Sequence, residues 1–213
     1  EVVQMIEEGR YRAVPYDPMH QVHTVWDLGW NDAMTVIMVQ RPSPSVINVI
    51  NYFEDSFRRY DEIVAMFRTL GYNWGTDWLP HDGLSKNPQT GRNAIDTLKA
   101  LGRNAVPISK HGLDREVGIR NARMLFPRVY IDNGARKASS GFLGAARLVE
   151  ALKRYKRNIP TTTGEPSTPA HDEFSHGCLV AGSLVETGRG LLPIEAVVVG
   201  DEVWTPAGYS RVL

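Results

Sequence analysis

Residues 24–32 read TVWDLGWND and decide the fold, because they form a strand that carries Asp27 to its end and then turns. Residues 22–28 favour a strand through their β-branched and aromatic side chains, and the glycine and Asn-Asp pair that follow are typical of a turn. Strands disfavour Asp, and a buried carboxylate is costly unless it is paired or holds a metal. Asp27 is therefore either a metal ligand or a strand-end residue that accepts hydrogen bonds from backbone N–H groups.

Two more apolar strands follow this stretch. Residues 33–40 and 46–53 are predicted strands, and the Arg-Pro-Ser-Pro-Ser segment at 41–45 breaks the chain between them. Three successive strands joined by short turns form an antiparallel meander. The meander places Asp27 on the central sheet rather than on a loop.

A helix and a fourth strand bring a second acid to the same edge. Asp55 or Ser56 is expected to cap the helix, and residues 73–79 form the next strand. A helix between two strands favours a parallel crossover, so this strand is expected beside the first one. It runs into Asp82, and two parallel strands side by side would bring Asp27 and Asp82 close together.

The next hundred residues alternate short helices and strands. Residues 84–92 form an exposed loop that holds Lys86 and Arg92. Helices are predicted at residues 93–101, 114–126 and 142–155, and strands at 105–108 and 128–131. The last helix ends in a basic run that either complements the helix dipole or contacts phosphates. Its cations are Lys153, Arg154, Lys156 and Arg157.

Composition narrows the function classes. The chain has 213 residues, 42% of them apolar and 23% charged, which is typical of a globular protein. Its 24 Lys and Arg balance 24 Asp and Glu, so any DNA surface must be a local patch. No apolar run reaches membrane-spanning length, the first residues lack the charged-then-apolar order of a signal peptide, and the single Cys178 fits a reducing compartment. The chain lacks an initiator Met and stops inside a predicted strand, so we expect a fragment of a longer protein.

Acids at the ends of elements predict a metal site. Asp27, Asp82 and one of Asp172 or Glu173 are hard oxygen ligands that suit Mg²⁺ or Mn²⁺. Two such ions about 3.5–4 Å apart can activate a water and stabilise the departing oxygen in phosphodiester hydrolysis. Zinc is disfavoured because the histidines share no helix face and the single Cys lies in another module. A nucleophilic Ser175 is disfavoured because the adjacent histidine would point away from it in a helix.

Five segments, taken in order, resemble the C-terminal nuclease domain of tailed-phage terminase large subunits. They are VPYDP at 14–18, WDLGWND at 26–32, PHD at 80–82, VGIRNARMLF at 117–126 and HDEFSHG at 171–177. The resemblance implies an α/β fold, namely a ribonuclease-H-like mixed sheet with flanking helices. It also implies a metal-dependent endonuclease that cuts concatemeric DNA during packaging.

The resemblance assigns the metal-binding acids of the family to individual residues of this chain. Asp27 matches the first metal-binding acid and Asp82 the second, and Asp172 is the candidate for the third. Family members continue the Ser-His-Gly segment into a helix with another Asp, and here Cys178 interrupts that continuation. The implied cofactors are two ions of Mg²⁺ or Mn²⁺. The implied partners are double-stranded phage DNA, an ATPase motor domain, the portal and the small terminase subunit, in the cytoplasm of the bacterial host. The motor itself is missing, since no GxxxxGK loop occurs in the chain.

From Cys178 onward the chain changes to short strands and tight turns, the pattern of an all-β module. A domain boundary is therefore predicted between Gly177 and Cys178, which divides the chain into residues 1–177 and 178–213. The segments CLVAGSLV at 178–185, GLLPIE at 190–195 and VGDEV at 199–203 resemble the first block of an intein, or Hint domain. The resemblance implies that the Cys178 sulfur attacks the Gly177 carbonyl in an N-to-S acyl shift. The alternative is a small buried Cys in an ordinary β module.

The intein resemblance covers only a first block. The downstream Thr-x-x-His segment and the final His-Asn are missing, so splicing in cis is not expected, and the intein is either truncated or split with a C-terminal partner. If Gly177 leads into the helix with the last acid, the unspliced chain is expected to cleave DNA weakly or not at all. Two other functions stay open. One is a DNA-docking or motor-contacting module without hydrolysis, and the other is a different self-processing protein with the Hint fold.

Overall fold

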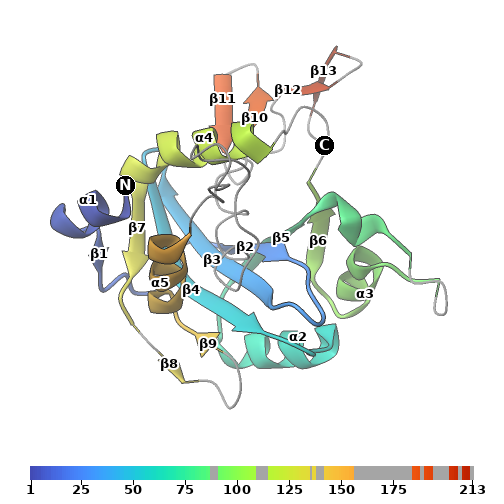
Figure 1. The fold of residues 1–213 in the computed structure, drawn as a ribbon. Helices are drawn as coiled ribbons and strands as arrows, with labels where there is room; N and C mark the ends of the chain where they lie inside the picture. Colours follow the sequence, from blue (N-terminus) through green and yellow to red (C-terminus); the bar gives the residue numbers. More distant parts are fainter. Residues whose placement is uncertain are drawn as a thin grey trace, which may run out of the picture.

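A mixed sheet of nine strands forms the centre of the protein (Figure 1). The computed structural model describes residues 1–86, 91–108, 115–134, 136–137 and 142–155, and the backbone of four short strands between 184 and 211. The main path of the sheet runs β1-β7-β4-β3-β2-β5-β6, with β9 beside β4 and β8 beside β9. Its strands are β1 (Tyr11–Arg12), β2 (Val22–Asp27), β3 (Met34–Ser43), β4 (Val46–Asp55), β5 (Trp74–Leu79), β6 (Asn104–Pro107), β7 (Val129–Asp132), β8 (Arg136–Lys137) and β9 (Phe142–Leu143). The helices are α1 (Val2–Glu7), α2 (Tyr60–Thr69), α3 (Ala94–Ala100), α4 (Arg115–Leu125) and α5 (Ala146–Arg154), with 3₁₀ turns η1 (His81–Leu84) and η2 (Phe126–Arg128).

The predicted antiparallel meander is confirmed. Strand β2 pairs antiparallel with β3, and β3 pairs antiparallel with β4. Val25 and Trp26 point to opposite faces of β2 and both are buried, so this strand is covered on both sides. Asp27 therefore ends a central strand, as the sequence predicted.

The parallel crossover is also confirmed. Strand β5 lies parallel to β2, with Val25 opposite Trp78, and β6 lies parallel to β5. Helix α2 makes the connection from the meander to β5. The sheet is thus mixed, and the carboxyl ends of β2, β4 and β5 lie at one edge, because β4 runs in the same direction as β2.

Each face of the sheet has its own apolar core. On one face, Trp26 and Phe53 pack with Phe67 of α2 and with residues of α3. On the other face, Ile37 and Tyr52 pack with residues of α1 and α5. Figure 1 shows the sheet between these two groups of helices. Two buried faces explain why the central strands read as nearly continuous apolar runs.

Two predicted element boundaries near the meander are wrong. Strand β3 continues through Pro42 to Ser43, because an irregularity in the pairing lies between Gln40 and Ser43, where a proline breaks no regular ladder. Helix α2 begins at Tyr60 after an Arg59 N-cap, so Asp55 and Ser56 do not cap it. Asp55 instead ends β4, opposite the first residue of β3.

The start of the last predicted helix is wrong as well. Residues Phe142–Leu143 form β9 against β4, and helix α5 begins only at Ala146. Gly144 separates the two elements with φ +124°, a backbone angle that favours glycine and that no α-helix contains. The interior of the helix follows the prediction, since Val149 is buried against the sheet.

The C-terminal segment forms short strands, as expected. Strands β10 (Leu184–Thr187), β11 (Gly190–Pro193), β12 (Glu202–Thr205) and β13 (Gly208–Arg211) make an antiparallel sheet in the order β11-β10-β12-β13. The predicted boundary between Gly177 and Cys178 lies outside the described residues and stays a prediction. In the part of the chain that the structure describes, no helix is long and apolar enough to cross a membrane.

Candidate functional site

Asp27 is half-buried at the carboxyl end of β2. It lies opposite Thr35 of β3, which lies opposite Glu54 of β4, so the three side chains share one face of the sheet. Glu54 binds Arg147 of α5 on that face, with Oε1 and Nη2 2.7 Å apart. Asp27 therefore projects from the face of the sheet that α5 covers.

Asp82 lies just past the end of the neighbouring strand. The chain leaves β5 through Pro80, and Asp82 follows in the 3₁₀ turn η1 with its side chain exposed. The turn packs on the end of β2, because a Cβ placed on Gly83 would lie 3.4 Å from Leu28 Cδ1. Asp27 and Asp82 thus reach the same edge of the sheet from two adjacent parallel strands, as the sequence predicted.

Gly29 shapes the turn that follows Asp27. A Cβ at this position would lie 2.6 Å from the Asp32 carbonyl oxygen and 2.7 Å from that of Ala33. Both atoms belong to the backbone, so neither can move without opening the turn. Glycine is required here by close approach, and it keeps the β2–β3 connection folded back beside the acid.

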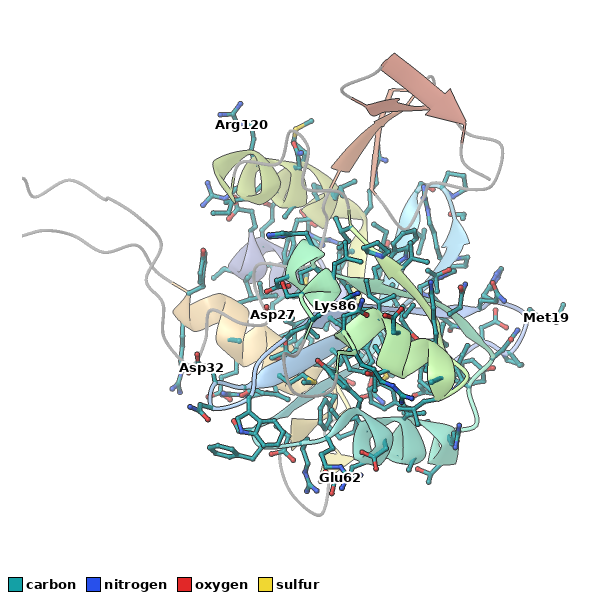
Figure 2. All side chains as sticks on the ribbon, turned by 90° about the vertical axis from the view of Figure 1, so that its right-hand side faces the viewer. Met19, Asp27, Asp32, Glu62, Lys86 and Arg120 are labelled. Atoms are coloured by element: carbon teal, nitrogen blue, oxygen red, sulfur yellow. The ribbon has the colours of Figure 1, made fainter. Side chains whose placement is uncertain are left out.

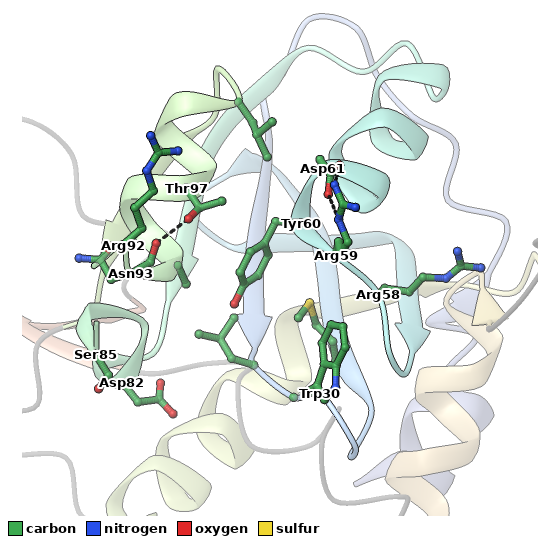
Figure 3. Close-up of a pocket in the computed structure, with 15 residues that line it drawn as sticks. Trp30, Arg58, Arg59, Tyr60, Asp61, Asp82, Ser85, Arg92, Asn93 and Thr97 are labelled. Carbon is green, nitrogen blue, oxygen red and sulfur yellow. Dashed lines mark hydrogen bonds and ion pairs between the residues drawn. The ribbon is translucent and has the colours of Figure 1, made fainter. Parts of the chain in front are cut away.

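A pocket of about 780 Å³ opens at this edge (Figure 3). Its walls come from the β2–β3 turn, the start of α2, the turn η1 and the start of α3. Figure 3 shows the Tyr60 ring in the middle of the pocket, with Trp30 and Arg58 on one side and Asp82 and Arg92 on the other. The volume lies in the range of small-molecule sites, which is roughly 300–1,000 Å³.

Charges of both signs line this pocket. Burial, together with the nearby Asp82 carboxylate, raises the pKa of Tyr60, so its hydroxyl stays protonated at neutral pH. Arg58 Nε binds Asp55 at 2.7 Å, and Arg59 Nη2 binds Asp61 at 2.5 Å. The hydrogen bond from Arg59 lowers the pKa of Asp61. These ion pairs hold the two guanidinium groups in place at the rim of the pocket.

A buried ion pair lies beneath the site and joins its two strands. Asp77 of β5 is 0% exposed. Its carboxylate accepts hydrogen bonds from Nε and Nη2 of Arg103, at 2.8 and 2.5 Å. Thr24 of β2 donates its hydroxyl to the same carboxylate and accepts the Trp26 indole N–H at 2.7 Å. The Arg103 guanidinium lies 4.2 Å from the centre of the Trp74 ring. This network fastens β2 to β5, the two strands whose carboxyl ends lead to Asp27 and Asp82.

Sequence reasoning missed this network. Its only signal is an Asp inside an otherwise apolar strand, since the Arg partner lies 26 residues away. The pairing could be found only once β5, β6 and α3 were folded together.

No protein-family model and no curated protein matches the chain. Solved structures do match. The nuclease domain of the P22 large terminase has a TM-score of 0.57 at 16% identity, covering 78% of this chain and 81% of that domain. The g2p (large terminase) nuclease domain from the bacteriophage SPP1 with bound Mn has a TM-score of 0.51 at 14% identity, covering 73% and 80%. The fold is that of a large terminase nuclease domain.

A longer protein shares this fold. The large terminase from a thermophilic bacteriophage, solved in complex with ATP-gamma-S, has a TM-score of 0.57 at 12% identity and matches over 82% of this chain. The match covers 42% of that large terminase, so this chain spans about two fifths of its length.

Within the large terminase nuclease fold, the other predicted site residues lie in different places. Lys86 and Arg92 are exposed near η1 and α3, and Arg92 lines the pocket. Lys153 and Arg154 are exposed in the last turn of α5, and Arg154 binds Glu150 at 2.9 Å. Gly177, Asp172, Glu173, Cys178, Lys156 and Arg157 lie outside the described residues. In the described ranges, no three acidic, His or Cys side chains form a group that could hold a metal ion.

The segment at 14–18 has a structural role in this fold. The buried amide of Gln40 accepts the Asp17 N–H at 2.9 Å and donates to the Asp17 and His20 carbonyls at 2.7 Å. The Tyr16 hydroxyl accepts the Asn73 N–H at 2.8 Å. The segment therefore anchors the loop before β2 at the opposite end of the strand from Asp27. Figure 2 shows Met19 of this loop and Asp32 of the β2–β3 turn on opposite sides of the molecule.

Proposed function

We propose that residues 1–177 are a metal-dependent DNA endonuclease domain of a phage terminase large subunit, which cuts concatemeric DNA during packaging. One observation carries the proposal. The parallel pairing of β2 with β5 brings Asp27 and Asp82 to one edge of a sheet whose fold is shared with large terminase nuclease domains. The SPP1 domain with this fold was solved with bound Mn.

The donor set at this edge fits a hard divalent ion. Asp27 and Asp82 supply carboxylate oxygens, which Mg²⁺ and Mn²⁺ prefer, and the exposed Asp82 leaves space for water and substrate phosphate. Of the acids that the resemblance assigns to the metal, Asp27 and Asp82 lie among the described residues, and we propose Asp172 as the third ligand, with Glu173 as its alternative. Two ions are proposed, which when bound would lower the pKa of a water and neutralise charge on the phosphate.

The residues of the pocket bind and position the strand to be cut. Arg58, Arg59 and Arg92 present guanidinium groups, which match phosphate oxygens in geometry and charge. The protonated Tyr60 hydroxyl offers a neutral hydrogen-bond donor beside Asp82. The acids at the edge and the cations at the rim together suit a phosphodiester backbone.

Plasmid cleavage by the whole chain, with and without Mn²⁺, tests the proposal. We expect metal-dependent cutting that falls about 100-fold or more in Asp27→Asn and in Asp82→Asn, because each change removes a ligand worth several kcal/mol to the transition state. Asp96→Asn, an exposed change on α3, is the matched control and should cut normally.

The same variants separate the rival function. If folded wild-type protein binds DNA but cuts none, and calorimetry detects no Mn²⁺ binding that Asp27→Asn removes, the module docks DNA without hydrolysis. Cutting by both variants at the wild-type rate would also overturn the proposed site. We propose an ATPase motor domain, the portal and the small terminase subunit as partners, in the cytoplasm of the bacterial host.

A second function is proposed for residues 178–213, namely the start of a protein-splicing element. The antiparallel strands β10–β13 support a β-rich module there. The Cys178 sulfur would bond to the Gly177 carbonyl carbon as the peptide C–N bond breaks, and the freed amine would take the thiol proton. Dithiothreitol should then release residues 1–177 as a thioester, detected by mass spectrometry. Cys178→Ala should release none, and equal release from both proteins would refute the acyl shift.

A further inference from the structure

Two aromatic rings stand exposed beside the pocket. Trp30, from the β2–β3 turn, is 56% exposed, and Phe57, from the connection between β4 and α2, is 61% exposed. Their ring centroids lie 6.0 Å apart at 86°, and the Phe57 N–H donates to the Trp30 carbonyl at 2.9 Å. This backbone bond ties the two turns together. The rings are therefore held as a fixed pair, although most of their surface faces solvent.

The backbone of Phe57 adopts an unfavourable conformation in this pair. Phe57 has φ +57°, and it is the only non-glycine residue with a positive φ in the part of the chain that the structure describes. A bulky aromatic residue is rare in this region because its Cβ crowds the backbone. Strain of this kind persists where surrounding contacts impose it, and it gathers at binding sites. Exposure of both rings adds a further cost that a ligand covering them would remove.

Three arginines line the pocket beside the rings, together with Asp61 and Asp82. Arg58 and Arg59 directly follow Phe57 in the chain, and both line the same pocket as Trp30. The Arg59 side chain is 69% exposed, and the Arg58 contact to Asp55 uses only one of the five N–H donors of a guanidinium. Arg92 lies on the opposite wall. Aromatic faces beside arginines form the usual surface for unpaired nucleotides, because rings stack on bases and guanidinium groups contact phosphates.

We propose that Trp30 and Phe57 form a stacking platform for an unpaired base of the DNA strand that enters the nuclease site. The proposal rests on the proposed function, since Asp82, one of the two proposed metal ligands, lines the same pocket as Trp30. The pocket of about 780 Å³ is wide enough for a nucleotide. A base that stacks here must leave the duplex, so the nuclease would hold locally opened DNA.

Binding of a fluorescein-labelled single-stranded oligothymidine in EDTA tests the platform, because no metal is then present for cleavage. Trp30→Ala and Phe57→Gly should each weaken the Kd about 5- to 150-fold. Phe57→Gly relieves the positive φ, so its Tm should equal or exceed that of the wild type, which a purely structural role for the ring would not allow. Met19→Ala is the control, since Met19 is 84% exposed and lies across the molecule from the β2–β3 turn (Figure 2).

The outcomes separate this proposal from the nuclease itself. Unchanged oligonucleotide binding in both folded ring variants would overturn the platform, even if the wild type cuts plasmid. Weakened binding in both variants supports the platform, and it does so whether or not Asp27→Asn abolishes cutting. If the ring variants bind DNA normally but change the oligomeric state in sedimentation, the rings contact protein and the platform is wrong.

Discussion

Replacing Arg103 with Met should destabilise the protein strongly, because it leaves a charge buried without its partner. Asp77 is 0% exposed and the Arg103 side chain only 6%, and two hydrogen bonds of 2.8 and 2.5 Å join them. Removing one member of a buried ion pair costs about 3–5 kcal/mol. For a chain of this size each kcal/mol lowers Tm by about 2–4 °C, so Tm should fall by roughly 6–20 °C.

Thermal unfolding of the whole chain at pH 7, followed by circular dichroism, measures this fall. Arg68→Met is the matched control, because Arg68 is exposed on α2 and makes one hydrogen bond to a backbone carbonyl. Arg68→Met should lower the free energy of unfolding by less than about 1 kcal/mol. A loss in Arg103→Met no larger than in the control would refute the role assigned to the pair.

A double variant checks the physical reason. In Asp77→Asn/Arg103→Met neither position carries a buried charge, and the Asn side-chain oxygen can still accept a hydrogen bond from the Thr24 hydroxyl. The double variant should therefore be more stable than Arg103→Met alone, by about 1–3 kcal/mol. If the stability losses of Asp77→Asn and Arg103→Met, each measured alone, simply add in the double variant, the buried charge is not the cause of the destabilisation.

Three further changes test the local structure around the site. Gly29→Ala should cost about 1–3 kcal/mol in unfolding experiments, because its Cβ would meet carbonyl oxygens at 2.6 and 2.7 Å, whereas Gly118→Ala meets nothing within 4 Å and should cost nothing. Burial lowers the pKa of His23, so the unfolded chain gains a proton near pH 6.5 before the folded chain does. Stability should therefore fall as the pH drops below about 6.5, and His23→Gln should flatten that fall. Asn93→Ala removes a side chain that accepts a backbone N–H at 2.7 Å at the start of α3, and urea unfolding should show a loss of about 0.5–2 kcal/mol.

Much of the fold and part of the site could be predicted from local sequence. The apolar runs around Asp27 predicted the meander, because strand propensity and turn residues act over a few positions. The helix between β4 and β5 predicted the parallel pairing that brings Asp82 to the same edge of the sheet as Asp27, since crossover connections have a strong topological preference. The start of α5 could not be predicted in the same way, because β9 forms only by pairing with β4.

The sequence by itself determined most of the segments that become strands or helices, because residue types and their short-range spacing set local structure, and it nominated Asp27 and Asp82 as candidate ligands. Tertiary structure alone decided which side chains meet. It brought Arg103 under Asp77, and it set Trp30 against Phe57 at the rim of the pocket. The physical reason is that these contacts join residues far apart in the chain, and their free energy exists only after the sheet has fixed the register of its strands.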